Sequence, residues 1–514
     1  MPFLIDWYGF WPLQSLNTAP AALLSLAILL GTYLVFLVAT RLCLHPLRNI
    51  PGPKLAGLTE WYEFYFDVVA NGTLVKNLPR LHEKYKSAVI RISPYHVHVN
   101  DPDFYHVVYR AGTDYLKAPY FYKGLGYPDS LISILDPKKH RILRNTIAPL
   151  FSPAAIDEYA PRIHRLIEKT AGKMAEGIKT GEAICIQHLF RCFGVDIVYV
   201  TLFGQADEFV DNYRQPHGLI ESMDQFTDRM WLIKHFPSLN KVTKYLPSRF
   251  QLPGYARLLE QCTNWVEETR ARREKGQLTT AEGITTVFDA MLQPNEAKGY
   301  DVRTPTELID EAALLLIAGS DTSAYTLTAA TYYLLSAPAA LNTLREELDG
   351  AKLPIQNGDW EEIRKLPYLM AVVKESLRLS TPVPGITPRV VPPAGATVQG
   401  HFIPGGTIVS MTHRSIHDNA DLFPHPEAFE PERWLGEEGK ALDRWQVAFS
   451  KGSRQCVGSP LAYQDLAMTL SHVFSRFDMQ LHDTDASNME WMDHAVAVNR
   501  KPVQVRVVQD RWVQ

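Results

Sequence analysis

The pattern of apolar and polar residues along the chain predicts a mainly helical protein with a few short strands. Apolar side chains recur at helical spacing in residues 162–178, 307–335 and 461–477. Stretches rich in alternating or β-branched residues, which are typical of strands, lie toward both ends of the chain: 88–99, 396–404, 407–411 and 501–508. We therefore expect a mainly α fold with small β-sheets.

A long apolar stretch near the N-terminus stands apart from this globular pattern. No Asp, Glu, Lys or Arg occurs between Asp6 and Arg41, and the stretch exceeds the roughly 20 residues that a bilayer-spanning helix needs. The alternative, a cleaved secretory signal, usually has an apolar region of about 7–15 residues after a basic start. The first ten residues lack that basic start, so the pattern favours an uncleaved membrane anchor.

Charges that flank this stretch predict its orientation. Arg41, Arg48 and Lys54 follow it, whereas only Asp6 precedes it. Positive residues favour the cytosolic side of a membrane, so the long C-terminal part should be cytosolic. We expect four parts: a lumenal N-terminus at 1–18, a transmembrane anchor at 19–40, a Pro-rich hinge at 41–54 and one catalytic domain at 55–514.

Composition excludes some classes of protein. The 514 residues carry a formal net charge of -4, and no segment concentrates Lys and Arg as a nucleic-acid binder would require. We therefore expect no nucleic-acid partner. The five cysteines are odd in number and none is spaced as CxxC, which argues against a disulfide framework or a cysteine-rich zinc site.

One of these cysteines lies in a loop suited to a reactive thiolate. Cys456 precedes a predicted helix that begins near Ser459, and the positive end of a helix stabilises an anionic sulfur. Gly452 and Gly458 would let a flat ligand approach the backbone, while Arg454 offers a cation to an acidic group. Taken alone, a single Cys is more often a small buried hydrophobe.

The residues around Cys456 change that reading. Phe449, Gly452, Arg454, Cys456 and Gly458 match all five fixed positions of FxxGxRxCxG, and the loop resembles the signature of the haem-thiolate monooxygenases, the cytochrome P450 family. The resemblance implies the cytochrome P450 fold and haem b, with Cys456 as axial ligand of the iron. It also implies that Arg454 pairs with a haem propionate and that Phe449 shields the sulfur. Thiolate ligation favours O–O cleavage.

The segment AGSDTS, residues 318–323, is similar to the family's oxygen-activation motif. From the residues alone, the Thr322 hydroxyl could simply bond back to the carbonyl of Ala318 within its own helix. Gly319, however, weakens a helix that otherwise has no reason to be weak. The resemblance implies that Asp321 and Thr322 guide protons to dioxygen.

A further segment, KESLRLSTPVP, places Glu375 and Arg378 three residues apart on a helix, where they can meet on one face. An exposed pair of this kind contributes only about 0–1 kcal/mol. The pair nevertheless resembles the family's ExxR, and FEPERW then supplies Arg433 as a third member. The resemblance implies a structural network that holds the haem pocket.

Three more residues are candidates for haem contacts. His140 and Arg144 lie one helical turn apart, near where many family members carry WxxxR, although His replaces Trp here. Arg389 lies where the family has another propionate-binding arginine. The alternative for the first two is a basic helix face in solvent. Neighbouring cations could instead face an acidic reductase domain: Lys138, Lys139 and Arg141.

Four segments are expected to line the substrate pocket, because they occupy the places where family members vary most: 118–135, 218–237, 314–318 and 382–387. Their largely apolar side chains favour a lipophilic substrate. The candidates are Phe121, Tyr122, Phe226, Trp231, Leu315, Ile317, Val383 and Ile386. The alternative for each aromatic residue is a place in the hydrophobic core.

The whole resemblance implies a monooxygenase that inserts one oxygen atom from O₂ into a lipophilic substrate. Electrons would come from NADPH through NADPH-cytochrome P450 reductase, with cytochrome b5 as a further candidate partner, at the endoplasmic reticulum membrane. The overall sequence is similar to fungal secondary-metabolism members, most of all the trichodiene oxygenase-like group. This similarity favours a terpenoid substrate over a polyketide or an alkaloid. One alternative is a haem-thiolate isomerase or dehydratase without external electrons, and another is a non-catalytic membrane-bound haem or lipid-binding protein. The intact Asp321–Thr322 pair disfavours both.

Overall fold

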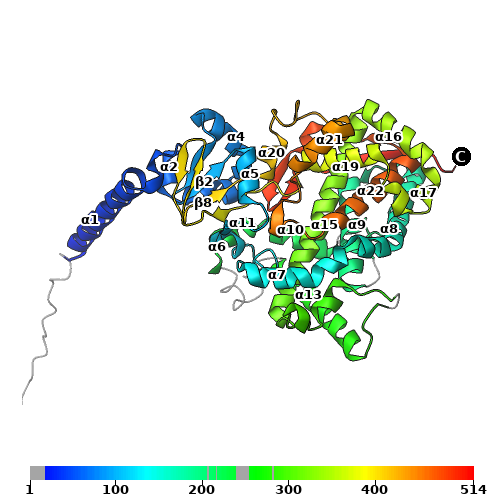
Figure 1. Ribbon diagram of the computed structural model, residues 1–514, viewed down its shortest axis with the longest axis horizontal. Helices are drawn as coiled ribbons and strands as arrows, with labels where there is room; N and C mark the ends of the chain where they lie inside the picture. The colour runs from blue at the N-terminus through cyan, green and yellow to red at the C-terminus, as the bar shows by residue number, and fades with distance from the viewer. Residues whose placement is uncertain (1–17, 205–207, 216, 239–253, 281–282, 514) are drawn as a thin grey trace, which may run out of the picture.

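The computed structural model describes residues 18–204, 208–215, 217–238, 254–280 and 283–513. A helical body carries one five-stranded sheet and smaller sheets and hairpins (Figure 1), which confirms the mainly α prediction. The helix α15 (Pro305–Ser336) runs through the middle of this body. Asp6 and most of the predicted lumenal N-terminus lie outside the described residues.

The central helix begins and packs for reasons that the sequence makes clear. The Thr304 hydroxyl oxygen accepts a hydrogen bond from the backbone N–H of Glu307, and the Glu307 carboxylate accepts one from the N–H of Thr304, which forms a capping box. Gly319 allows close packing, since a Cβ there would lie 2.6 Å from the side chain of Val198 on α9 (Ile186–Phe203). The glycine that weakens the helix therefore lets a second helix approach it.

Most of the other helices surround α15, whereas α2, α4 and α5 lie beside the large sheet and α1 projects away (Figure 1). The N-terminal half of the chain contributes α1 (Thr18–Val38), α2 (Lys54–Leu58), α3 (Trp61–Phe64), α4 (Leu74–Tyr85), α5 (Pro102–Val108), α6 (Pro119–Tyr122), α7 (Pro137–Ile147), α8 (Pro153–Thr180), α10 (Gly218–Thr227) and α11 (Met230–His235). The C-terminal half contributes α13 (Tyr255–Glu274), α14 (Val287–Met291), α16 (Pro338–Gly350), α17 (Lys352–Gln356), α18 (Trp360–Ile363), α19 (Pro367–Ser380), α20 (His413–His417), α21 (Gly436–Leu442) and α22 (Ser459–Arg476).

The largest sheet has the order β1-β2-β8-β5-β3, and only its β2–β8 pair is parallel. Its strands are β1 (Val89–Ser93), β2 (His96–Val99), β3 (Leu116–Lys117), β5 (Arg389–Val390) and β8 (Ile408–Ser410). The smaller pairings join β4 (Ile184–Cys185), β12 (Gln504–Asp510) and β9 (Phe477–Leu481), then β6 (Ala396–Val398) with β7 (His401–Ile403), and β10 (Trp491–His494) with β11 (Val496–Asn499). All four β-like stretches of the sequence form strands.

The apolar N-terminal helix projects away from the globular body beside α2 and the large sheet (Figure 1). The span Ala22–Cys43 has a mean hydropathy of 2.5, and none of its most apolar window is buried. A second apolar helix, Ile186–Phe203, is 72% buried and belongs to the core. The exposed span therefore fits a membrane anchor, whereas α9 is an interior helix.

The Pro-rich segment after the anchor packs against the sheet. Leu47 and Ile50 are buried, and the carbonyl of Pro51 accepts a hydrogen bond of 2.7 Å from the backbone N–H of Arg91 in β1. A Cβ at Gly52 would lie 2.3 Å from the carbonyl oxygen of Arg91. The segment thus holds the sheet at a fixed place beside the anchor.

Candidate active site

The shape of the Cys456 loop depends on Gly452 and Phe449, which both belong to the motif around the cysteine. Gly452 has φ +72, and a Cβ there would lie 2.3 Å from the carbonyl oxygen of Tyr109, so only glycine fits. The backbone N–H of Cys456 donates to the carbonyl of Phe449 over 2.9 Å. The Phe449 ring packs against Tyr463, with centroids 5.4 Å apart. The loop therefore holds Cys456 directly before α22, as predicted.

The Cys456 thiol has competing influences on its pKa. The residue is exposed by surface area, yet surrounding protein atoms desolvate the sulfur, and this burial raises its pKa. The backbone N–H groups of Gly458 and Ser459 and the charge of Arg144 act in the opposite direction. The helix N-terminus thus favours the thiolate as predicted, but burial outweighs it. A bound metal cation would deprotonate the sulfur outright.

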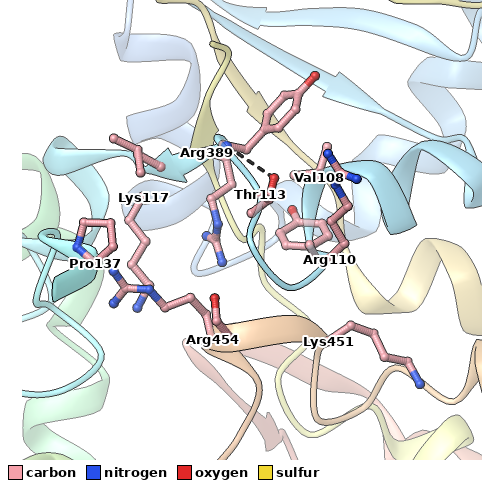
Figure 2. Close-up of a pocket in the computed structure, with 12 residues that line it drawn as sticks. Val108, Arg110, Thr113, Lys117, Pro137, Arg389, Lys451 and Arg454 are labelled. Carbon is pink, nitrogen blue, oxygen red and sulfur yellow. Dashed lines mark hydrogen bonds between the residues drawn. The ribbon is translucent and has the colours of Figure 1, made fainter. Parts of the chain in front are cut away.

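A group of buried cations faces a pocket beside this loop (Figure 2). Lys117 and Arg389 are directly paired across β3 and β5, and both side chains are buried. Arg454 points into the same space (Figure 2), where it donates to the carbonyl oxygens of Ile134 and Leu135 over 2.8 and 3.0 Å. Like charges directly opposite one another are destabilising, so this arrangement calls for an anion.

Burial and mutual repulsion lower two pKa values in this cluster, whereas Tyr122 and Tyr109 raise the pKa of Arg389 against the effect of its burial. Burial and the charges of Arg389 and Arg454 hold the pKa of Lys117 well below its usual range. Burial and Arg389 lower the pKa of Arg454 to about 10. Among the described residues, no carboxylate forms an ion pair with Lys117, Arg389 or Arg454 within 4.0 Å. The protein itself does not neutralise the cluster.

His140 and Arg144 take different places on α7. His140 is buried, and desolvation together with Arg454, Lys117 and Arg144 lowers its pKa to about 3. It therefore stands beside the cation cluster as a neutral imidazole. Arg144 donates to the carbonyl oxygen of Gln455 over 2.6 Å, which holds the loop next to Cys456. The predicted alternative of a solvent-facing basic face does not describe His140.

These residues fit the haem that the Cys456 loop implies. A haem carries two propionates on one edge, and Lys117, Arg389 and Arg454 form an uncompensated cationic edge of that kind. Cys456 offers one soft sulfur ligand on the adjoining loop, and Gly458 leaves the backbone beside it without a side chain. The donor set therefore suits an iron porphyrin with one thiolate ligand.

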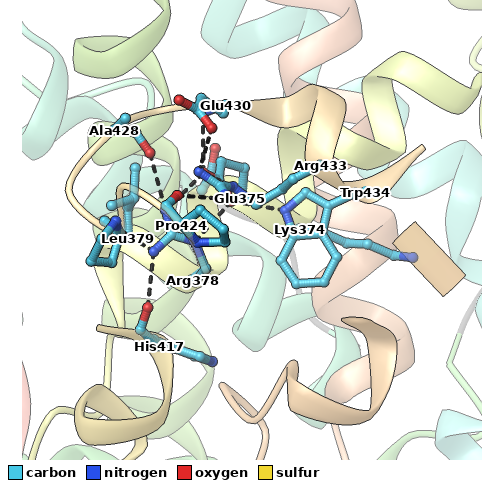
Figure 3. Close-up of polar contacts among 12 residues, drawn as sticks. Lys374, Glu375, Arg378, Leu379, His417, Pro424, Ala428, Glu430, Arg433 and Trp434 are labelled. Carbon is cyan, nitrogen blue, oxygen red and sulfur yellow. Dashed lines mark hydrogen bonds and ion pairs between the residues drawn. The ribbon is translucent and has the colours of Figure 1, made fainter. Parts of the chain in front are cut away.

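The predicted network of Glu375, Arg378 and Arg433 forms as a closed, buried set of contacts (Figure 3). Arg378 donates from Nε and Nη2 to the two carboxylate oxygens of Glu375, over 2.9 and 2.7 Å. Arg433 adds a bond of 3.1 Å to Glu375 Oε1, and Trp434 donates from Nε1 to Oε2 over 2.8 Å. Arg378 and Glu375 are completely buried, so the pair is far from the solvated one that spacing alone suggests.

Arg378 also binds the end of α20 and the segment that contains Pro426 and Ala428. Its guanidinium donates to the carbonyl oxygens of His417, Pro426 and Ala428 over 3.0, 2.7 and 3.1 Å (Figure 3). Both members of the ion pair therefore have their hydrogen-bonding groups occupied, which a buried charge requires. This network fixes the segment that leads toward the Cys456 loop.

The acidic member of AGSDTS is paired with a residue that no motif identified. Arg191, on α9, has its Nε 3.1 Å from Asp321 Oδ1, and its Nη1 lies 2.6 Å from Asp224 Oδ1 on α10. Burial raises the pKa of Asp321, and Arg191 is the largest influence that lowers it. The ion pairs therefore connect the centre of α15 to two neighbouring helices.

Thr322 has the local bond that its helix position suggests. Its Oγ1 donates to the carbonyl oxygen of Ala318 over 2.7 Å. Ala318 and Gly319 are nevertheless exposed at the middle of a helix whose other residues are largely buried. The helix surface beside Thr322 is therefore accessible on the side of Ala318, where a bound group could reach the hydroxyl.

The candidate pocket residues divide into several environments. Tyr122 accepts a hydrogen bond from Arg389 and so belongs to the cation cluster. The Phe226 ring stacks on Tyr255 in the core, with centroids 5.4 Å apart. Phe121 and Trp231 face each other at 5.9 Å. The remaining candidates are buried or half-buried along α15 and the segment after α19: Leu315, Ile317, Val383 and Ile386.

Sequence reasoning missed several residues of this site. Trp434 directly follows Arg433, so its place beside Glu375 could have been read from FEPERW. Lys117 and Arg191 stand in segments with no recognisable motif. They reach the site only because β3 pairs with β5 and because α9 packs against α15.

Comparison with known proteins agrees with this geometry. A family model described as cytochrome P450 matches residues 57–507. The chain is 39% identical over 494 residues to cytochrome P450 monooxygenase aneF of Aspergillus aculeatus, which covers 95% of this chain and 99% of the relative. It is 42% identical over 478 residues to monooxygenase phqM of Penicillium fellutanum (91% and 88%). Cytochrome P450 monooxygenase ankB of Aspergillus thermomutatus is 39% identical over 496 residues (94% of each chain).

Proposed function

Because the chain belongs to the cytochrome P450 family of monooxygenases, we propose that it oxygenates a lipophilic secondary metabolite with electrons delivered from NADPH by a reductase. The observation that carries this proposal is the meeting of an uncompensated cationic edge with the Cys456 loop. A non-catalytic haem or lipid-binding protein would gain nothing from the intact Asp321–Thr322 pair.

The chain's own residues have distinct tasks in this proposal. Cys456 holds the iron of haem b, while Lys117, Arg389 and Arg454 hold its propionates and His140 supports that edge. When bound, a haem with a thiolate ligand supplies the chemistry that activates dioxygen. Arg144 steadies the loop through the Gln455 carbonyl, and Phe449 shields the sulfur.

On α15, Asp321 and Thr322 would move protons to the reacting oxygen. Asp321 passes a proton at its carboxylate, and Arg191 holds that carboxylate in place at 3.1 Å. The Thr322 hydroxyl already donates to Ala318, and its two lone pairs stay free to accept a proton donor. The polar groups thus stand ready on an exposed part of an otherwise buried helix.

Membrane and partner proposals rest on the surface around this site. The exposed apolar helix α1 would anchor the chain as a single-pass protein of the endoplasmic reticulum, with the catalytic domain cytosolic. Three exposed cations lie on α7, close in sequence to His140 and Arg144: Lys138, Lys139 and Arg141. They would attract an acidic partner such as NADPH-cytochrome P450 reductase, or cytochrome b5.

The substrate is proposed from the apolar segments near α15. Phe121, Ile317, Val383 and Ile386 would offer apolar contacts. The resemblance of the sequence to the trichodiene oxygenase-like group favours a terpenoid skeleton, with a polyketide or alkaloid as the alternative.

Turnover under labelled oxygen tests the proposal. Full-length protein reconstituted with a fungal reductase, NADPH and ¹⁸O₂ should insert one ¹⁸O into members of a terpenoid, alkaloid and polyketide panel. Omission of NADPH should abolish the product. Product that forms without NADPH, or that contains no label, would instead favour the isomerase or dehydratase alternative.

A further inference from the structure

Asp493 is a buried carboxyl that none of the motifs accounts for. It lies in β10, next to the turn to β11, and is only 5% exposed. Its backbone is fixed on both sides, because its N–H donates to the carbonyl of Gly72 over 3.2 Å and its carbonyl accepts from the indole N–H of Trp231. The side chain is therefore held in one place by contacts that do not use its carboxyl group.

Only one oxygen of this carboxyl has a partner. Oδ1 accepts a hydrogen bond of 3.0 Å from the backbone N–H of Ala495, whereas no described residue donates to Oδ2. Oδ2 retains some accessible surface, since it is not one of the fully buried side-chain atoms that lack a partner. Asp493 Oδ2 has the capacity to accept a donor from outside the chain.

Residues of three segments expected to line the substrate pocket lie around Asp493, one of them against its carboxyl group. A Cβ at Gly385 would lie 3.1 Å from Asp493 Oδ2, and Gly385 stands between Val383 and Ile386 in the segment after α19. Trp231 contacts Asp493 from α11, and Phe121 packs on the Trp231 ring. Because Gly385 has no side chain, no methyl group presses on Oδ2 from that segment.

The nearby charges make this location favourable for a cation. Lys234 is the nearest ammonium, but its Nζ is bound to Glu63 at 2.8 Å and to Asp67. Burial, and then Asp67, raise the pKa of Asp493 to about 7, against a smaller opposing effect of Lys234. Lys234 and His235 are thus engaged by Glu63 and Asp67. Among the described residues no cation pairs with the Asp493 carboxylate, and a positive ligand would supply that partner.

We propose that Asp493 is a specificity-determining residue, whose Oδ2 accepts a hydrogen bond from a protonated amine of the substrate. The substrate class is then a lipophilic skeleton that carries a basic nitrogen. This inference rests on the proposed function and narrows it: an alkaloid, or a terpenoid that bears an amine, fits the site better than a terpene hydrocarbon.

Paired ligands test the role of the amine. We choose three tertiary amines on indole, decalin and abietane skeletons, each with an isostere in which CH replaces the ammonium N–H; the indole pair is N,N-dimethyltryptamine and 3-(3-methylbutyl)indole. Binding to the haem-loaded full chain is measured at pH 7.4 by isothermal titration calorimetry. A charge-assisted hydrogen bond corresponds to about a ten- to hundredfold preference for the amine. If no amine binds at least tenfold tighter than its isostere, the proposal is overturned.

Two variants locate the preference. Asp493→Asn keeps an oxygen for the Ala495 N–H and should bring the affinity ratio close to one, with the isostere unaffected. Gly385→Ala keeps the carboxylate but places a methyl group 3.1 Å from Oδ2, and it should lower the ratio in the same way. The control Asp228→Asn removes an exposed carboxylate that pairs with His494 at 3.0 Å, and it should leave the ratio unchanged.

The assignment to Asp493 would be overturned if the preference for the amine over its isostere persisted in both Asp493→Asn and Gly385→Ala. It would also be overturned if that preference fell equally in the control Asp228→Asn. If Asp493→Asn does not fold, Gly385→Ala decides the question. These titrations need neither NADPH nor dioxygen. A chain that binds amines through Asp493 but never oxygenates them would refute the proposed function while this inference stands.

Discussion

Arg191 Nε lies 3.1 Å from Asp321 Oδ1, so that a cation of α9 is paired with the acid of AGSDTS at the centre of α15. The same guanidinium binds Asp224 on α10. Since α10 also carries Phe226, one arginine joins the proposed proton path to an element that the sequence predicts to line the substrate pocket.

This pairing predicts a change in the pH dependence of turnover. Burial raises the pKa of Asp321, and Arg191 opposes that rise. Arg191→Gln removes the opposing charge, so the pKa of Asp321 should rise further and the carboxylate should protonate at higher pH. An opposite charge at this distance lowers a carboxyl pKa by about 1–3 units. We expect the acidic limb of product formation to move up by about 1 unit.

The control for this change is Arg214→Gln, which removes an exposed arginine that pairs with Glu182. Its pH profile should match that of the unmodified protein. An unchanged acidic limb in Arg191→Gln would show that Asp321 does not set the pH dependence.

Thr322 provides a separate prediction on coupling. Thr322→Ala removes a hydroxyl that is bonded to Ala318, and the helix should tolerate the loss because alanine is a good helix former. Without the hydroxyl, protons should reach the reacting oxygen less efficiently, and NADPH should be consumed to form hydrogen peroxide. A positioned general acid contributes about 10²–10⁴-fold in rate. Product per NADPH should therefore fall well below that of the unmodified enzyme.

Thr322→Ser is the matched control, since it restores the hydroxyl and should restore coupling. Peroxide and product are measured in the same reaction. Equal coupling in Thr322→Ala would mean that the hydroxyl serves only its own helix.

The buried ion pair predicts a large loss of stability. Arg378→Met removes the guanidinium that donates to both oxygens of Glu375 and to the carbonyls of His417, Pro426 and Ala428. Breaking a buried pair costs about 3–5 kcal/mol, and haem retention should fall with it. Urea unfolding followed by haem absorbance measures the effect.

An exposed pair with the same spacing on a helix provides the comparison. Lys440 and Glu437 form an i,i+3 bridge of 2.6 Å at the surface, and Lys440→Ala should change stability by about 0–1 kcal/mol. Equal losses at the two pairs would contradict the role given to burial.

The sequence predicts those residues of the site that belong to one short segment of the chain. Cys456, Glu375, Arg378 and Arg433 belong to short motifs, and the helices and strands around them follow from local periodicity and capping. Their environment was less predictable: the ion pair proved to be fully buried, and burial raises the pKa of Cys456 although a helix start favours its thiolate.

The residues that escaped prediction are joined only by the tertiary fold. Lys117 meets Arg389 across a two-residue strand 272 positions later in the chain, as the register Lys117↔Arg389 gives. Asp493 meets Gly385 because the β10–β11 hairpin packs on the segment after α19. Neither contact has a periodicity or spacing that a single sequence could reveal.

Two truncations test the membrane anchor and the segment after it. Removal of residues 1–38 deletes α1 and should release the protein from membranes with haem bound, because no site residue lies there. Removal of residues 1–52 also deletes Leu47 and Ile50, which are buried. The second truncation should therefore lose stability by several kcal/mol.

Membrane flotation and haem content of the two truncations give the answer. If the protein that lacks residues 1–38 still floats with membranes, a second membrane contact exists in the globular part. Equal stability of the two would show that the Pro-rich segment is only a tether.

The central claim is that Cys456 ligates a haem iron, and the carbon monoxide difference spectrum of the reduced protein tests it most directly. The unmodified protein should show the red-shifted band of a thiolate-bound haem, and Cys43→Ala, which removes another exposed cysteine, should show it equally. Cys456→Ala should abolish the band. A red-shifted band that persists in Cys456→Ala would contradict the assignment of the iron ligand and the account built on it.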